Sequence, residues 1–152
     1  MSKIWIGIDP DTDKNGVAIW YKDSKELVLK NLSFFELFSL LSELKTAFDI
    51  QVIVDAGWLN KKTNFRQKFL NKKTGQYEEH SIGVKEKMAG HTFANHETGK
   101  KIVEMCEFLS LAVSLNKPTR SKSNAERFKA VTGYVGRTNQ ETRDAGLLVF
   151  GR

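Results

Sequence analysis

The chain has 152 residues, 40% of them hydrophobic, which is enough for one domain with a core of its own and too few for two. A single cysteine, Cys106, excludes an internal disulfide framework and fits a reducing compartment. No apolar run approaches the roughly 18 residues of a membrane-spanning helix, and the first residues lack the features of a signal peptide. We therefore expect residues 1–152 to form one cytoplasmic domain without membrane contact.

Positive charge is concentrated in two segments, although the net charge is only +6. Residues 58–87 and residues 117–152 each contain eight Lys or Arg against three acids. One such segment is often just a solvated face, but two of them in one chain favour a polyanionic partner.

Three strands are predicted at the start of the chain. The runs 4–8 and 17–21 are rich in β-branched and aromatic residues and are separated by a polar turn, which predicts a hairpin. The first run is almost continuously apolar, indicating a buried strand, and it leads directly into Asp9. Residues 26–32 alternate in polarity and predict a third strand at the sheet edge.

A helix and a fourth strand follow. Apolar residues recur at helical spacing over 34–48, and Ser33 with Glu36 predicts a capping box at the start of that helix. Residues 50–54 form a short β-rich run that ends on a second acid, Asp55. The order strand–strand–strand–helix–strand allows this run to lie parallel to the first, so that both acids end neighbouring strands.

Residues 56–90 differ in kind from the rest, because aromatic rings alternate with cations there. A connection of this length is usually functional or disordered, and we expect a mobile, partly helical insertion. Rings stack on bases while cations meet phosphates, so residues 58–90 are predicted to bind nucleic acid, with the rings anchoring the loop to the core as the alternative. The residues concerned are Trp58, Lys61, Lys62, Phe65, Arg66, Lys68, Lys72 and Lys73.

The remainder of the chain is predicted to be helical. Residues 91–115 carry a broad apolar face, wide enough for both the sheet and a partner subunit, and residues 116–118 end that helix. Ser123 or Asn124 can cap a short helix that Gly133 closes. A basic turn at 136–139 then leads into a last helix over 140–150.

The last helix opens with Glu141 and Asp144, which lie on one face of its first turn. Acids at a helix start are also favoured by the helix dipole, which is the purely structural explanation. Together with Asp9 and Asp55, however, they make four carboxylates that would repel one another unless cations neutralise them. Carboxylates are the ligands of hard divalent metals, and two such ions can drive phosphodiester hydrolysis.

Several stretches resemble the RuvC-type Holliday junction resolvases of the RNase H-like superfamily. These are IGIDPDTDKNGVAIW at the opening strand, DAGW at the fourth strand end, ANHETGKKI on the long helix and TNQETRDAGLLVF at the last helix. The resemblance implies an α/β fold with an RNase H-like mixed sheet flanked by helices. It also implies a homodimer that resolves branched DNA by paired nicks, using two Mg²⁺ or Mn²⁺ ions in each active site.

Carried over by residue, the metal-binding and catalytic tetrad would be Asp9, Asp55, Glu141 and Asp144, and Trp58 would stack at the junction. The family usually has Glu where this chain has Asp55. Asp11 replaces a frequent Gly and is a further candidate ligand, and the candidates for the family's active-site lysine are Lys122 and Lys129. The long basic insertion resembles a phage or mobile-element version, so the host would be a bacterial or phage-infected cell.

Some interpretations stay open. Arg137 is assigned to DNA, but Arg137 and Arg143 flank the acidic pair and could instead bind its carboxylates. Within the nuclease class the substrate could be a flap, a fork or an RNA-containing duplex. The other classes are an actin- or hexokinase-like phosphotransferase, which needs a second lobe, and a non-catalytic nucleic-acid-binding module.

Overall fold

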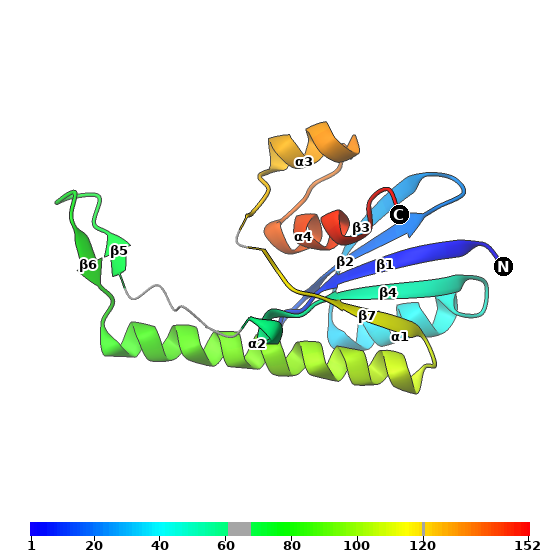
Figure 1. Cartoon of the computed structure of the whole chain (residues 1–152), viewed down its shortest axis with the longest axis horizontal. Helices are drawn as coiled ribbons and strands as arrows, with labels where there is room; N and C mark the ends of the chain where they lie inside the picture. The colour runs from blue at the N-terminus through cyan, green and yellow to red at the C-terminus, as the bar shows by residue number, and fades with distance from the viewer. Residues whose placement is uncertain (61–67, 120) are drawn as a thin grey trace.

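The computed structural model describes residues 1–60, 68–119 and 121–152, which form two sheets and four α-helices (Figure 1). The strands of the main sheet are β1 (Lys3–Asp9), β2 (Asn15–Tyr21), β3 (Glu26–Leu32), β4 (Asp49–Asp55) and β7 (Ala112–Asn116). The helices are α1 (Phe34–Leu44), the short 3-10 helix η1 (Gly57–Leu59), α2 (Ile82–Phe108), α3 (Ala125–Thr132) and α4 (Gln140–Val149). A small hairpin consists of β5 (Lys68–Leu70) and β6 (Tyr77–Glu79).

The main sheet is mixed, with strand order β3-β2-β1-β4-β7. The three N-terminal strands form an antiparallel meander, whereas β4 and β7 run parallel to β1. The predicted hairpin, the edge position of β3 and the parallel pairing of the strands that end in Asp9 and Asp55 are all confirmed.

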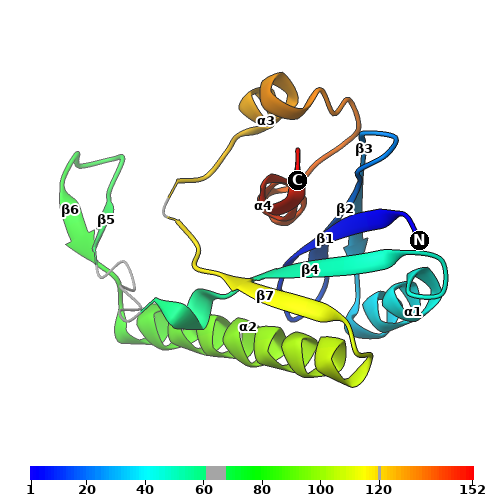
Figure 2. The ribbon, with the colours of Figure 1, turned by 45° about the vertical axis from the view of Figure 1, so that its right-hand side comes forward.

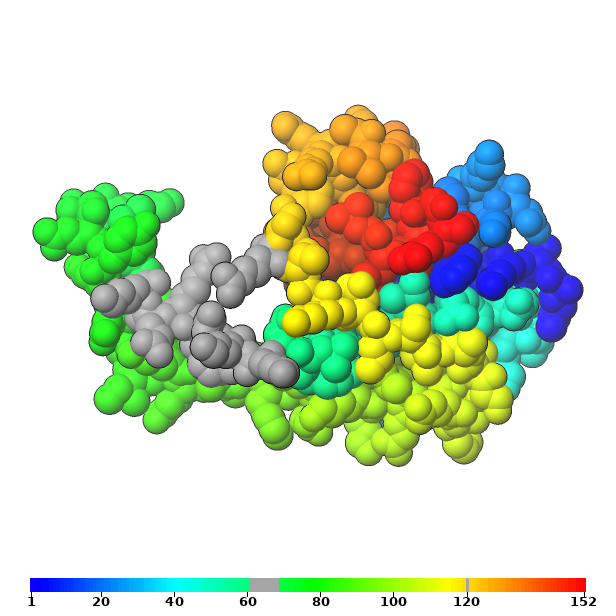
Figure 3. All heavy atoms as spheres, in the orientation of Figure 1, coloured from blue at the N-terminus to red at the C-terminus, as the bar shows by residue number. Residues whose placement is uncertain are grey.

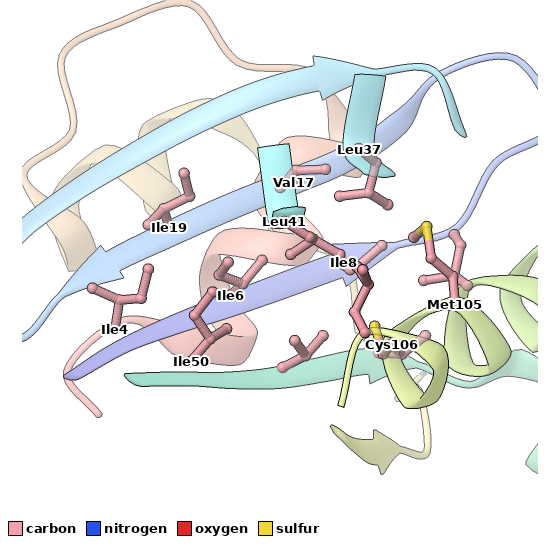
Figure 4. Close-up of a cluster of buried hydrophobic side chains, with 14 residues drawn as sticks. Ile4, Ile6, Ile8, Val17, Ile19, Leu37, Leu41, Ile50, Met105 and Cys106 are labelled. Carbon is pink, nitrogen blue, oxygen red and sulfur yellow. The ribbon is translucent and has the colours of Figure 1, made fainter. Parts of the chain in front are cut away.

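Helices cover both faces of the sheet (Figure 2). On one face, Ile4, Ile6 and Ile8 belong to the larger core together with Leu41 of α1 and Cys106 of α2 (Figure 4). On the other face, α4 packs on the sheet, and its residues join a smaller core whose members are Ala18, Trp20, Ile53, Ala145 and Val149. Successive residues of a strand point to opposite faces, so Asp9 and Asp55 lie on the same side of the sheet as α4.

Two glycines of the sheet allow α4 to lie unusually close to it. A Cβ atom on Gly7 would come within 2.3 Å of the Ala145 carbonyl oxygen, and one on Gly16 within 2.2 Å of the Glu141 carbonyl oxygen. Side chains at these positions would push the helix outward. The first turn of α4 therefore lies directly over the strand ends that carry the acids.

Local capping signals were reliable predictors in this chain. Ser33 and Glu36 form the predicted capping box, although α1 ends at Leu44 rather than at residue 48. Asn124 caps α3, whose left-handed C-cap is Gly133 with φ 72°. The last helix lies where the sequence predicts it.

The prediction of one helix over 91–115 is wrong at both ends. The helix begins nine residues earlier, at Ile82, where the Ser81 side chain accepts a hydrogen bond from the Val84 amide. It ends at Phe108, Ser110 adopts a left-handed φ of 57°, and residues 112–116 form β7. The first turns of α2 lack apolar periodicity because only the C-terminal part of the helix packs on the core. Residues 112–116 form a strand rather than more helix because they pair with the open edge of β4.

The described part of the predicted partly helical insertion contains the start of α2, as expected, and also the β5–β6 hairpin, which the sequence did not predict. The hairpin stands at the N-terminal end of α2 and projects beyond the body of the molecule (Figure 3). None of the described helices is long and apolar enough to cross a membrane.

Candidate active site

The two strand-end acids are neighbours across a parallel strand pair. Ile8 of β1 pairs with Val54 of β4, so the residues that follow them, Asp9 and Asp55, end adjacent strands at the same edge. Carboxyl ends of parallel strands are the usual place for functional residues in α/β folds.

The first turn of α4 adds the second pair of acids. The side chain of Asn139 accepts a hydrogen bond from the Thr142 amide at 2.8 Å and starts the helix. Glu141 then lies against Gly16, and Gly16 is the residue of β2 that pairs with Asp9. The four predicted carboxylates are thereby brought to one edge of the sheet from three separate elements.

The charges of these carboxylates raise one another's pKa values, as Asp9 and Asp55 show. Burial raises the pKa of Asp9 to about 7, and the charges of Asp55, Asp144 and Glu141 add to that shift while Lys122 opposes it. Burial also raises the pKa of Asp55, although its hydrogen bond from Asn116 and the charge of Lys122 oppose this. Asp9 is the group on which all the other charges converge.

Lys122 is the cation of this cluster. Its ammonium forms a salt bridge with Asp144, whose side chain is only 11% exposed. Burial lowers the pKa of Lys122, but the hydrogen bond to Asp144 and the nearby negative charges outweigh burial and raise it. Of the two lysines that the resemblance suggested, Lys122 therefore lies at the carboxylates, while Lys129 lies on α3.

Two amide side chains orient the acids. Asn116 Nδ2 donates to Asp55 Oδ1 at 3.2 Å, and Gln140 Nε2 donates to Asp144 Oδ1 at 2.8 Å. Sequence reasoning missed both residues. The sequence pattern around Asn116 predicts a helix end, which conceals its contact with Asp55, whereas Gln140 is recognisable as the residue one turn before Asp144.

A pocket of about 210 Å³ opens beside Asp9 and Asp55, and we call it the ring pocket because Trp58 forms one of its walls. The Trp58 ring lies edge-on to His96 of α2, with 6.5 Å between the ring centroids, and packs against Gly99, where a Cβ would come within 2.4 Å of it. Burial and the charge of Lys100 lower the pKa of His96. The remaining residues that line the ring pocket are Pro10, Gly57, Thr92, Asn95, Pro118 and Lys122.

His96 also lines this pocket, and sequence reasoning did not identify it because its place there depends on the packing of α2 against Trp58. Asn95 also contributes, since its Oδ1 accepts a hydrogen bond from the Thr12 amide and ties α2 to the turn that follows Asp9.

The predicted DNA-binding residues are distributed differently. Trp58 lies at the acids, whereas Lys72 and Lys73 are exposed in the turn of the projecting hairpin. Arg137 is exposed in the loop before α4, and Lys68 begins β5. The predictions for Lys61, Lys62, Phe65 and Arg66 lie outside the described residues.

Arg143, a candidate for binding the acidic pair, and Asp11, a candidate metal ligand, both form hydrogen bonds with nearby groups. Arg143 donates to the Ser123 carbonyl, to Thr138 Oγ1 and to Gln140 Oε1, so it contacts neighbouring loop and helix groups. The Asp11 side chain accepts a hydrogen bond from the Asp13 amide within the β1–β2 turn.

The donor set suits a divalent cation in its chemistry, because Asp9, Asp55, Glu141 and Asp144 supply only carboxylate oxygens. Over the ranges 1–60, 68–119 and 121–152, no three His, Cys, Asp or Glu side chains stand close enough to form a metal site as they are. Lys122 holds Asp144 in this arrangement, so ion binding would have to compete with that salt bridge.

Comparison with known proteins identifies the fold. No protein-family model and no curated protein sequence matches the chain. Among solved structures, it is similar to T. thermophilus RuvC in complex with Holliday junction substrate, with a TM-score of 0.50 and 13% identity over 97% of this chain and 90% of that chain. The chain therefore has the predicted α/β fold, a mixed five-stranded sheet flanked by helices, as in that RuvC structure.

Proposed function

We propose that this protein is a divalent-metal-dependent endonuclease that resolves four-way (Holliday) junctions in DNA by paired symmetric nicks. One observation carries the proposal: the carboxylates of Asp55 on β4 and of Glu141 and Asp144 on α4 surround Asp9 on β1, and burial together with their charges raises the pKa of Asp9 to about 7. Several carboxylates at one edge of a sheet repel one another and destabilise the folded state unless cations are bound there. The RuvC-like fold supports junction DNA as the substrate, since the similar solved structure is a complex with a Holliday junction.

We assign Asp9, Asp55, Asp144 and Glu141 as the residues that would hold Mg²⁺ or Mn²⁺. Two ions bound there would supply an activated water and neutralise charge on the leaving oxygen of the phosphodiester. The chain's own groups would prepare the site, because Asn116 holds Asp55 and Gln140 holds Asp144 in fixed orientations.

Lys122 and Trp58 would act on the DNA strand itself. Lys122 lines the ring pocket and its ammonium forms the salt bridge with Asp144, so it would contact a phosphate oxygen bound there and offset its charge. The Trp58 ring offers a face on which an unpaired base can stack beside Asp9. Lys72, Lys73 and Arg137 would bind phosphates further along the DNA.

Paired nicks require two active sites, so a homodimer belongs to the proposal. An apolar groove of about 360 Å³ lies between α1 and α2, on the opposite face of the sheet from α4. Phe35 and Phe108 in that groove are 78% and 79% exposed, which is unusual for a monomer surface. The apolar segment 91–115, which the sequence analysis expects to face both the sheet and a partner subunit, contributes part of this groove.

Two alternatives remain as competing functions. The same acids would also serve a nuclease for flaps, forks or RNA-containing duplex. A non-catalytic binding module is favoured by the Lys122–Asp144 salt bridge, because it already neutralises one of the four acids. We retain the phage or mobile-element source as a prediction from the basic insertion.

The deciding experiment is cleavage of labelled four-way junction, flap and linear duplex in Mg²⁺ or Mn²⁺. We compare the wild type with Asp9→Asn and Asp144→Asn, and use Asp49→Asn as the matched control because Asp49 is exposed at the opposite end of β4. Symmetric nicks in the junction that disappear in the first two variants, while binding is retained, would support the proposal.

Other outcomes would redirect the assignment. Junction binding without cleavage in either metal would favour the binding module. Preferential cleavage of flaps or of RNA-containing duplex would keep the acids as the catalytic site but change the substrate.

A further inference from the structure

A second pocket adjoins the ring pocket at Lys122. It has a volume of about 190 Å³, and Asp55, Pro118 and Lys122 line both pockets. We call it the arginine pocket, since Arg152 forms one of its walls. Its other lining residues are Asn116, Thr119, Ser121, Asp144, Leu147 and Leu148.

The two pockets differ in the chemistry they offer. The ring pocket contains an indole and an imidazole, which suit the flat face of a base. The arginine pocket has no aromatic lining residue; beside the acids Asp55 and Asp144, it is lined by the cations Lys122 and Arg152 and by the hydroxyl-bearing Thr119 and Ser121. Hydroxyl and guanidinium donors are the groups that proteins most often direct at sugar and phosphate oxygens.

Arg152 is held in place by three contacts. Its Nε donates to the Leu148 carbonyl at 3.3 Å, and its guanidinium lies 5.8 Å from the centroid of the Trp5 ring. Its own carbonyl accepts a hydrogen bond from Trp20 Nε1 at 3.1 Å. Within the described part of the chain Arg152 forms no salt bridge, so its charge is available to a ligand in the pocket.

Each pocket is smaller than the roughly 300–1,000 Å³ of a typical ligand site, which limits each to about one nucleotide component. Because they meet at Lys122, a strand that passes over the acids would enter both pockets at once. We propose that the arginine pocket is a subsite for the DNA phosphate next to the scissile one, bound by Arg152, while the ring pocket takes a base from the other side. This inference rests on the proposed nuclease function and extends it to residues outside the tetrad.

The test combines protein variants with neutral linkages in the DNA. Arg152→Gln removes the charge at similar length, and Arg127→Gln on α3 is the matched control, since Arg127 is exposed and lines neither pocket. Junctions carry one methylphosphonate at either phosphate beside the mapped cleavage position. Affinity is measured in Mg²⁺ in an Asp9→Asn background, and KM and kcat are measured without that change.

We expect Arg152→Gln to lower junction affinity about tenfold and to raise KM with little change in kcat, whereas Arg127→Gln does neither. One of the two neutral linkages should lower affinity about tenfold when Arg152 is present and by less than twofold when it is replaced. Ser121→Asp, which does not touch the Trp5 contact, should weaken binding further by placing a negative charge in the pocket.

Two results would overturn the subsite, and they are distinguishable from failure of the proposed function. If the wild type cuts junctions but Arg152→Gln behaves like Arg127→Gln, only the subsite is wrong. The same holds if both neutral linkages weaken binding equally in all variants. If the wild type binds no branched DNA, the nuclease proposal and the subsite fail together.

Discussion

Asp9 is the residue at which fold stability and the proposed chemistry conflict. Its carboxyl is half-buried at the end of β1, and its pKa is raised from 3.8 to about 7 by burial and by the neighbouring carboxylates. The unfolded chain therefore releases this proton at lower pH than the folded protein does. The contribution of the protonated Asp9 carboxyl to the free energy of unfolding is therefore fully present below about pH 4 and is lost as the pH rises through about 7.

Replacing Asp9 with Asn should stabilise the metal-free protein at high pH. At pH 8 in EDTA we expect Asp9→Asn to raise the free energy of unfolding by about 1–3 kcal/mol, because no charge has to be buried. At pH 4 the difference from the wild type should nearly vanish. Urea unfolding at both pH values measures this, with Asp49→Asn as the control that changes an exposed acid. A wild type that is as stable at pH 8 as Asp9→Asn would contradict the prediction.

Lys122 and Lys129 provide a comparison between two lysines that the sequence could not separate. Only Lys122 forms a salt bridge with Asp144 and acts on the pKa values of Asp9 and Asp55. We expect Lys122→Gln to lower kcat for junction cleavage by about 100-fold, because a preorganised positive charge beside the reacting phosphate is lost. Lys129→Gln should leave kcat unchanged. Single-turnover cleavage distinguishes the two, and equal effects would argue against a role for Lys122.

At the residue scale, prediction from sequence depended on whether a residue's partners were local. Asp9 and Asp55 were recognisable because each follows an apolar run, and their convergence followed from parallel pairing. Lys122 could not be selected because its contact with Asp144 joins residues 22 positions apart. His96 was overlooked because it depends on the packing of α2 against Trp58.

At the scale of elements, the position of α4 depends on glycines in the sheet beneath it. A methyl group on Gly7 would overlap the Ala145 carbonyl oxygen and approach the Val149 side chain. Gly7→Ala should therefore destabilise the protein by about 1–3 kcal/mol and displace Asp144 from Asp9. Gly83→Ala is the matched control, because a Cβ there has no atom within 4 Å and should be neutral or slightly stabilising. Urea unfolding and junction cleavage are both measured, and an undisturbed Gly7→Ala protein would show that α4 can shift at little cost.

The elements that could be predicted from sequence are those whose own residues carry the pattern of a strand or the capping residues of a helix. Residues 26–32 alternate, and the capping box at Ser33 and the glycine at 133 mark helix ends. The boundaries of α2 and the existence of β7 lacked such a signal. Residues 112–116 form a strand because β4 presents an open edge beside them, which is a property of the assembled sheet.

At the scale of the whole molecule, the apolar groove between α1 and α2 exposes large apolar side chains that no other part of the described chain covers. It is lined by Phe34, Phe35, Phe38, Met105 and Phe108, with Lys101 and Glu104 at its side. Lys101 and Glu104 form an exposed salt bridge with each other. In a two-fold symmetric pairing of this surface, Lys101 of one copy could face Glu104 of the other, so the same residues would suit a self-complementary contact.

The dimer can be tested by placing charge in that groove. Phe108→Glu and Phe35→Glu should each convert a homodimer into monomers, because a stable interface of about 1,200–2,000 Å² does not tolerate an unpaired buried carboxylate. Val135→Glu is the control, since Val135 is 84% exposed and lies in the loop between α3 and α4. Sedimentation velocity measures the oligomeric state, and junction assays follow single nicks against paired nicks. Monomeric variants should still nick one strand but lose simultaneous cleavage, since each protomer has its own set of acids. A wild type that sediments as a monomer, or variants that remain dimeric, would remove this groove as the interface and leave the acids unaffected.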